Sequence, residues 1–202
     1  MTLLIFAFIF RMRILLIDNN DSFTYNLFHL IKGVISIEDS IEVCLTDGLT
    51  VDMAGDFDRI IISPGPGIPS ESRILMDIIE AHKERIPLLG ICLGHQAIAE
   101  SYGALIRNMS RPIHGTPAEI TIANRTRLFR GVNRRTVVGR YHSWEVSSAD
   151  FPACLEITAI DDNGCIMAFS HREHDVYGVQ FHPESFMTDC GQRIIANFIK
   201  ND

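Results

Sequence analysis

A cysteine stands between two glycines in the segment PLLGICLGHQAIA, residues 87–99. The apolar run before Cys92 and the helix-like pattern after it place this cysteine where a buried strand turns into a helix. Backbone N–H groups and the positive dipole end of such a helix stabilise a thiolate, the form of cysteine that attacks carbon. Gly90 and Gly94 suit a strained strand-to-helix turn. Taken alone, a cysteine in this position is more often a small core residue, so the interpretation depends on its partners.

The triplet His182-Pro183-Glu184 supplies the partners that a cysteine nucleophile needs. Residues two apart in an extended segment project to the same side, so Glu184 can contact the imidazole of His182. A carboxylate in that position fixes the ring tautomer and stabilises the imidazolium that forms when a thiol loses its proton. Such a triplet also occurs in surface turns. Its position after a strand-like segment favours the catalytic interpretation.

A third candidate is the loop Ser63-Pro64-Gly65-Pro66-Gly67. Its prolines cannot donate backbone hydrogen bonds, but its glycines can, and glycine permits close approach of a ligand. A rigid loop that presents N–H groups beside a nucleophile suits an oxyanion hole. A plain connecting turn remains the alternative.

The first half of the chain alternates strands and helices, which predicts a parallel sheet with helices on both faces. Four apolar runs predict strands at 13–17, 41–45, 59–62 and 87–91. Helical spacing predicts helices at 23–31, capped by Asp21 or Ser22, and then at 71–84 and 94–102. Ligands bind at the carboxyl ends of parallel strands. The loop at 63–69 and the turn at 91–96 both follow such ends, and we therefore expect them to meet there.

The second half predicts a smaller antiparallel β region. Short β-like segments lie at 118–122, 136–141, 155–159, 165–169 and 177–181. An Asn163-Gly164 turn gives the hairpin signal before the fourth of them. A final amphipathic helix is expected at 189–199. Because we find no linker or repeat, we interpret residues 12–202 as a single domain with an α/β fold: a mostly parallel central sheet flanked by helices.

Composition excludes several classes of protein. The chain has 202 residues, 47% hydrophobic and 21% charged, with a formal net charge of −7, which argues against a nucleic-acid binder. Five cysteines without a C-x-x-C pair disfavour a disulfide framework or a zinc site and suit a reducing cytoplasm. Nothing resembles a phosphate loop or a nucleotide fingerprint, so we expect neither a cofactor nor a metal.

The first residues are the compositional anomaly. The run Met1–Phe10 is apolar but too short to cross a bilayer, and it lacks the flanks of a secretory signal. We therefore predict no membrane association and interpret residues 1–11 as a start-site artefact, with translation from Met12. A native N-terminal extension is the alternative.

Together, these motifs resemble a known family. The stretches SPGPG, GICLGHQAIA, GRYHSW and FHPES, in this order, are similar to those of the class I (triad-type) glutamine amidotransferases, which have a flavodoxin-like fold. The opening ILLIDNNDSFTYNL resembles the glutamine amidotransferase subunits of anthranilate synthase and 4-amino-4-deoxychorismate synthase. The resemblance covers nearly all of residues 12–202.

The resemblance implies a mechanism. Cys92 would attack the side-chain amide of glutamine, and His182, oriented by Glu184, would protonate the departing ammonia. Water would then hydrolyse the γ-glutamyl thioester to glutamate. The backbone N–H groups of Gly65 and Leu93 would hold the oxyanion. The residues expected to bind glutamine are Gly67, Gln96, Ser143 and Trp144.

The resemblance also implies a partner. The ammonia would pass to a chorismate-binding synthase subunit in a heteromeric complex, making anthranilate for tryptophan biosynthesis. The aminodeoxychorismate branch of folate biosynthesis, or use in both branches, is the alternative. The chain departs from common family patterns at Asn20, Thr116 and Trp144, outside the triad.

Two readings from other functional classes stay open. A γ-glutamyl hydrolase-like enzyme would keep the fold and the triad but cleave a different bond, and the glutamine-binding positions Gln96 and Ser143 weigh against it. A non-catalytic regulatory module would keep only the fold. The intact Cys92, His182 and Glu184 weigh against that reading.

Overall fold

The computed structural model describes residues 11–200. The predicted start-site segment lies outside the described residues except for Arg11. The described strands are β1 Arg13–Asp18, β2 Ser40–Leu45, β3 Arg59–Ile62, β4 Leu88–Ile91, β5 Ile106–Ile122, β6 Arg135–Val146, β7 Leu155–Asp161, β8 Ile166–His171 and β9 Val176–Val179. The helices are α1 Thr24–Lys32, α2 Val51–Ala54, α3 Arg73–His82, α4 Leu93–Ser101 and α5 Gly191–Ile199, with short 3₁₀ turns at Thr46–Gly48, Pro69–Glu71 and Arg127–Phe129.

All of these strands belong to one sheet, in the order β2-β1-β3-β4-β9-β8-β7-β5-β6. The first five are parallel to one another, and from β9 onward each neighbouring pair is antiparallel. Every residue of β3, β4 and β9 is buried, as expected for parallel strands covered on both faces. The predicted fold class, a mostly parallel sheet with an antiparallel region in the second half, is confirmed.

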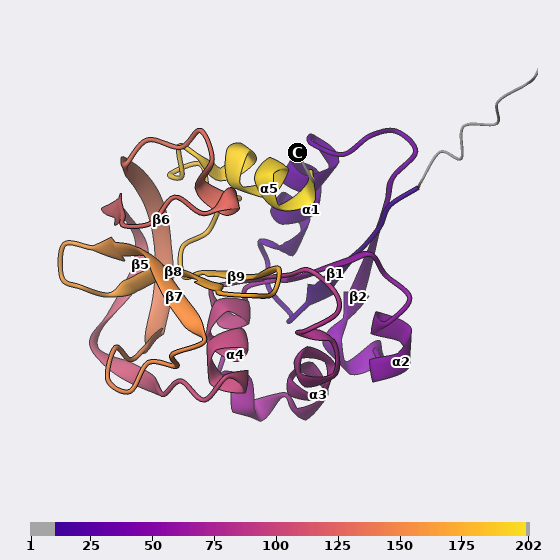
Figure 1. Ribbon diagram of the computed structural model, residues 1–202, viewed down its shortest axis with the longest axis horizontal. Helices are drawn as coiled ribbons and strands as arrows, with labels where there is room; N and C mark the ends of the chain where they lie inside the picture. Colours follow the sequence, from indigo (N-terminus) through magenta and orange to yellow (C-terminus); the bar gives the residue numbers. More distant parts are fainter. Residues whose placement is uncertain (1–10, 201–202) are drawn as a thin grey trace, which may run out of the picture.

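Helices cover both faces of the parallel part of the sheet (Figure 1). On one face α1 packs against α5, and Leu27 and Phe198 of these helices belong to the same hydrophobic cluster. On the other face α3 packs against α4, with Leu75 and Ile98 in a second cluster. The sheet therefore separates two apolar cores, and the central strands contribute side chains to both.

The local predictions differ from the structure mainly at helix ends. The helix expected at 71–84 begins at Arg73, because the 3₁₀ turn Pro69–Glu71 precedes it. The cap predicted for the first helix is wrong. Phe23 occupies the N-cap position, and the Asp21 carboxylate accepts the Phe23 N–H one residue too early to cap the helix. The short helix α2 was not predicted, although its N-cap Thr50 gives a recognisable signal.

The antiparallel region is more extended than its sequence pattern predicts. Strand β5 runs for 17 residues, whereas the sequence predicts only 118–122. Two shifts in its register with β6 interrupt the alternation of inward and outward side chains, between Asn108 and Ile113 and between His114 and Thr116. A periodicity-based assignment cannot follow a strand across such bulges. The predicted Asn163-Gly164 hairpin turn is present, with Gly164 at φ 78°.

The carboxyl ends of β3, β4 and β9 meet at one edge of the sheet. Ile62 of β3 is aligned with Gly90 of β4, and Ile91 of β4 is aligned with Val179 of β9. The loop at 63–67, Cys92 and the segment from Gln180 onward therefore leave the sheet side by side. This edge holds the residues whose chemistry the sequence singled out.

Candidate active site

Cys92 occupies a sharp turn between β4 and α4. Its φ of 53° is positive, which is strained for a residue with a side chain. Two backbone hydrogen bonds hold the turn: the Cys92 N–H donates to the Val179 carbonyl at 2.9 Å, and the Cys92 carbonyl accepts the Gln96 N–H at 3.1 Å. The turn presents the thiol at the N-terminus of α4, where the helix dipole favours negative charge. We call this strand–Cys92–helix turn the elbow.

The two glycines of the elbow are required by space. A Cβ on Gly90 would overlap the carbonyl oxygen of Gly94, and a Cβ on Gly94 would lie 2.7 Å from the Ile62 carbonyl oxygen. Such contacts are with backbone, so neither clash can be relieved by rotating a side chain. The G-x-C-x-G spacing therefore lets α4 start directly against β3 and β4.

His182 and Glu184 form a buried ion pair next to the elbow. The His182 Nδ1 and Glu184 Oε1 atoms are 2.7 Å apart, and the two side chains are 3% and 0% exposed. The backbone around His182 is fixed by an isolated bridge to Gly139 and by the Thr188 hydroxyl, which donates to the His182 carbonyl at 2.6 Å. Glu184 therefore holds the imidazole in one orientation, as its spacing predicts.

The electrostatics of His182 couple it to Cys92. Burial by itself lowers the pKa of His182, but hydrogen bonding to the Cys92 thiol and to Glu184 outweighs burial and raises this pKa to about 10. Within residues 11–200, the buried His182 Nε2 atom makes no hydrogen bond of ordinary geometry. In catalytic sites, such hydrogen bonds often become short only when the substrate binds. The surroundings of His182 therefore favour its protonated form.

A cavity of about 210 Å³ opens in front of Cys92. This volume is below the roughly 300–1,000 Å³ of sites for drug-sized ligands, and it suits a molecule of amino-acid size. The structure brings most of the predicted site residues together here. The predicted residues that line the cavity are Gly65, Gly67, Cys92, Leu93, Gln96, Ser143 and Trp144.

Gly65 is held tightly against the elbow. A Cβ on Gly65 would lie 2.6 Å from the Asn19 Cβ and 2.7 Å from the Leu93 side chain, so only glycine fits. Asn19 anchors the loop, because its N–H donates to the Ser63 hydroxyl and its amide donates to the Ser63 carbonyl, both at 3.0 Å. The loop backbone is thus fixed beside the first residue of α4, Leu93, as an oxyanion hole requires.

Sequence reasoning missed several residues of the site. Pro66, Tyr141 and His142 also line the cavity. The rings of Tyr141 and Phe23 lie 4.8 Å and 5.9 Å from the His182 ring, and so shield it from water. Tyr141 and His142 belong to the GRYHSW stretch, so their place in that motif is the signal that could have found them.

The described part of the chain was also considered for metal-binding groups and membrane-spanning helices. Between residues 11 and 200, no three His, Cys, Asp or Glu side chains are grouped so as to hold a metal ion. Over the same range, none of the helices has the length and apolar character needed to span a bilayer.

Comparison with known proteins decides the family. The family model described as Glutamine amidotransferase class-I matches residues 15–201. The chain belongs to the class I glutamine amidotransferases. Membership makes it an enzyme of the glutamine amidotransferase type, as the four motifs predict.

Individual relatives of this glutamine amidotransferase match over nearly the whole chain. It is 40% identical to aminodeoxychorismate synthase component 2 of Escherichia coli over 92% of this chain and 98% of that one. It is 41% identical to anthranilate synthase component 2 of Porphyra purpurea over 94% and 100%. It is also 43% identical to the bifunctional protein TrpGD of Thermotoga maritima, over 93% of this chain but 32% of that longer protein.

A solved structure supports the fold of the amidotransferase. A protein of Thermoplasma acidophilum superposes with a TM-score of 0.82 at 22% identity, covering 94% of this chain and 92% of the other. At this level of identity, the likeness concerns the fold alone.

Proposed function

We propose that the chain hydrolyses the side-chain amide of L-glutamine through a Cys92–His182–Glu184 triad and supplies the ammonia to a chorismate-using synthase subunit. One observation carries the proposal. Cys92 lies on a strained turn at a helix N-terminus and interacts with His182, a histidine that a buried carboxylate orients at 2.7 Å. An amino-acid-sized cavity opens in front of it.

The reaction proceeds in two steps. The Cys92 thiolate forms a bond to the amide carbon of glutamine, and the oxyanion is held by the backbone N–H groups of Gly65 and Leu93. The carbon–nitrogen bond then breaks, and the His182 imidazolium gives its proton to the departing ammonia. In the second step, water loses a proton to His182 and attacks the thioester. Glutamate leaves, and Cys92 is regenerated.

The cavity also fits the recognition of glutamine. Gly67, Ser143 and Trp144 line it, and Gln96, in the first turn of α4, lines it too. These residues would grip the amino-acid end of the substrate while the amide points at Cys92. The same arrangement disfavours the γ-glutamyl hydrolase-like alternative, whose substrates extend beyond a single amino acid.

The names of the relatives support a synthase partner and two candidate pathways. These relatives are named as components of anthranilate synthase and of aminodeoxychorismate synthase, at 41% and 40% identity. We propose the anthranilate synthase role, in tryptophan biosynthesis, as the first candidate. The aminodeoxychorismate role, or service to both synthases, is the second, because the identities are equal within one percentage point.

Replacing the nucleophile tests the proposal. In complex with a chorismate-using synthase subunit, Cys92→Ala should lower glutamine-dependent product formation more than about 1,000-fold, because no other group can form the thioester. Synthesis from added ammonium salt at alkaline pH should stay within about two-fold of the unsubstituted complex. Running the assay with each of the two synthase subunits identifies the pathway. Glutamine-dependent activity that survives Cys92→Ala contradicts the triad.

A further inference from the structure

Gln180 is a buried polar residue that has no role in the proposed hydrolysis of glutamine. It follows β9, two residues before His182, and its side chain is 0% exposed. Its Nε2 atom donates to the Cys92 sulfur at 3.6 Å, and its Oε1 atom accepts from the Gln96 amide at 3.1 Å. It therefore contacts the reacting atom directly.

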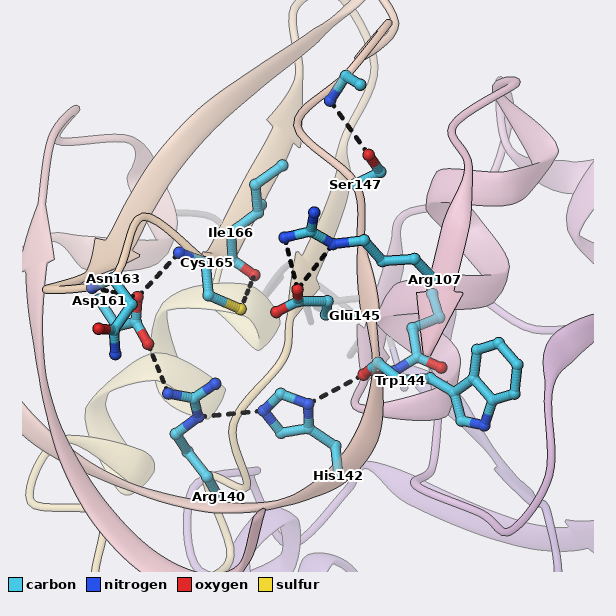
Figure 2. A network of polar contacts seen from close by, with 12 residues as sticks. Arg107, Arg140, His142, Trp144, Glu145, Ser147, Asp161, Asn163, Cys165 and Ile166 are labelled. Carbon is cyan, nitrogen blue, oxygen red and sulfur yellow. Dashed lines mark hydrogen bonds and ion pairs between the residues drawn. The ribbon is translucent and has the colours of Figure 1, made fainter. Parts of the chain in front are cut away.

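The orientation of the Gln180–Cys92 contact can be traced from the Arg140, His142 and Trp144 contacts that Figure 2 shows. The Arg140 guanidinium can only donate, and its Nε atom lies 3.0 Å from His142 Nε2. His142 Nε2 must therefore accept, which places the ring proton on Nδ1. That proton is donated to the Trp144 carbonyl oxygen at 2.9 Å. Burial, and then the nearby Arg140 charge, lower the pKa of His142 to about 4, in agreement with a neutral ring.

The Trp144 carbonyl oxygen in turn fixes the two amides. A carbonyl can only accept, so Gln96 must present its Nε2 atom to it, at 2.8 Å. The same nitrogen donates its second proton to Gln180 Oε1. The oxygen of Gln180 is thereby turned away from Cys92, and its N–H₂ group must face the sulfur. Flipping Gln96 would place its oxygen against the Trp144 carbonyl oxygen, and flipping Gln180 would place its nitrogen against that of Gln96, so neither amide can turn without a mismatched contact.

The far end of this series is rigid. Arg140 and Asp161 form an ion pair at 2.6 Å in which both side chains are 4% exposed. The other carboxylate oxygen of Asp161 accepts the N–H groups of Asn163 and Cys165 at 2.9 and 2.8 Å. The hairpin turn between β7 and β8 thus anchors the guanidinium from which the polarity begins (Figure 2).

We propose that Gln180 donates a hydrogen bond that stabilises the Cys92 thiolate. The hydrogen-bonded series that runs from Asp161 through Arg140, His142 and the Trp144 carbonyl to Gln96 fixes the Gln180 amide in the donating orientation. A donor beside the sulfur stabilises the thiolate over the thiol, because only the charged form gains a charge-assisted hydrogen bond. The inference rests on the proposed nucleophilic role of Cys92.

Other titratable groups near the sulfur do not obscure the test. His95 and His142 have pKa values lowered to about 3 and 4, chiefly by burial, so both stay neutral from pH 5 to 9. His182 has a raised pKa, and the charges of Glu184 and Asp21 act on its ring. The rate of Cys92 alkylation between pH 5 and 9 is therefore free of interference from His95 and His142 in the unsubstituted chain and in Gln180→Met.

The experiment measures the rate at which iodoacetamide alkylates Cys92 in the full chain as a function of pH. Tryptic cleavage after Arg85 and Arg107 releases a peptide in which Cys92 is the sole cysteine, so mass spectrometry isolates its rate. The pH at half of the plateau rate reports the thiolate fraction. In Gln180→Met, which keeps the size but removes the donor, this half-point should rise by about one pH unit, a ten-fold loss of thiolate.

A second substitution separates charge from packing. Gln180→Glu keeps the shape and places a negative charge near the sulfur, so its half-point should rise further than that of Gln180→Met. A second apolar variant, Gln180→Leu, carries the test of the lost donor if Gln180→Met does not fold. The exposed Gln192→Met on α5 is the matched control and should leave the half-point unchanged.

The outcomes distinguish the two proposals. A low half-point in the unsubstituted chain that is the same in Gln180→Met overturns the role of Gln180 and leaves the triad intact, whatever the result for Gln180→Glu. A half-point near 8.5 in the unsubstituted chain, the value of an ordinary thiol, overturns the activated nucleophile and the inference with it. Graded shifts, Glu above Met, support the inference.

Discussion

His182 holds its proton because two partners favour the imidazolium. Burial opposes the charge, yet the Cys92 thiol and the Glu184 carboxylate outweigh it, and the pKa of His182 rises to about 10. The two partners serve different purposes: Glu184 orients the ring from its Nδ1 side, and Cys92 exchanges a proton with its other side. The interaction of His182 with these two partners therefore also affects the stability of the fold.

The raised pKa of His182 makes stability depend on pH. A group whose pKa is higher in the folded state contributes stability that is complete below its unfolded pKa of about 6.5, and the contribution is lost as the pH rises toward 10. Glu184→Gln, which removes the carboxylate, should lower the free energy of unfolding by about 2 kcal/mol at pH 6.5. Urea unfolding at pH 6.5, 8 and 10 should show this difference shrinking. A difference that grows with pH would contradict the protonated pair.

The elbow is a strained turn that presents the Cys92 sulfur to the cavity. Cys92 adopts a positive φ, and the close approach of α4 to β3 and β4 depends on Gly90 and Gly94. Residues in sparsely populated backbone regions cost about 1–3 kcal/mol, and they persist where the surrounding structure determines them. Here the hydrogen bonds of Cys92 to Val179 and Gln96 supply that constraint.

The strain of the elbow can be measured with a pair of substitutions. Cys92→Ala keeps a Cβ and therefore the strain, whereas Cys92→Gly removes both the Cβ and the strain. We expect Cys92→Gly to be more stable than Cys92→Ala by about 1 kcal/mol. Glycine usually costs backbone entropy on folding, but at a positive φ it avoids the strain that alanine keeps. Chemical denaturation of the two inactive variants gives the comparison. Equal or lower stability of Cys92→Gly would show that the turn is unstrained.

The parallel and antiparallel halves share one continuous sheet, joined where β9 pairs with β8. The site uses both halves: Cys92 follows the parallel strand β4, while Ser143 and Trp144 come from the antiparallel strand β6. The buried Arg140–Asp161 pair connects β6 to the end of β7. A substitution in the antiparallel region should therefore lower the free energy of unfolding of the whole domain.

Two adjacent carboxylates provide the test. Asp161→Ala leaves Arg140 charged and buried, which should lower the free energy of unfolding by about 3–5 kcal/mol and the melting temperature by roughly 10 °C. Asp162→Ala removes an exposed pair with Arg135, at 3.9 Å, and should cost less than about 1 kcal/mol. Calorimetry should show one transition for each. Equal melting temperatures would contradict the importance of the buried pair.

The sequence alone predicted the elements that depend on local pattern. The apolar runs of the parallel strands, the G-x-C-x-G turn and the His-Pro-Glu triplet are each legible from neighbours along the chain. The alternation of strands and helices also placed the proline- and glycine-rich loop and the Cys92 turn at one edge of the sheet. Helix ends and the bulged strand β5 were less accurate, because caps and register depend on contacts that a local pattern does not contain.

The tertiary structure decided what distant segments do to one another. Cys92 and Gln180 are 88 residues apart, and Asp161, Arg140 and His142 lie on a different part of the sheet from both. Whether a buried amide presents its oxygen or its nitrogen depends on the donors and acceptors around it, and those are set by folding alone. The motif could therefore identify the attacking sulfur, whereas only the folded chain shows the hydrogen bonds that surround it.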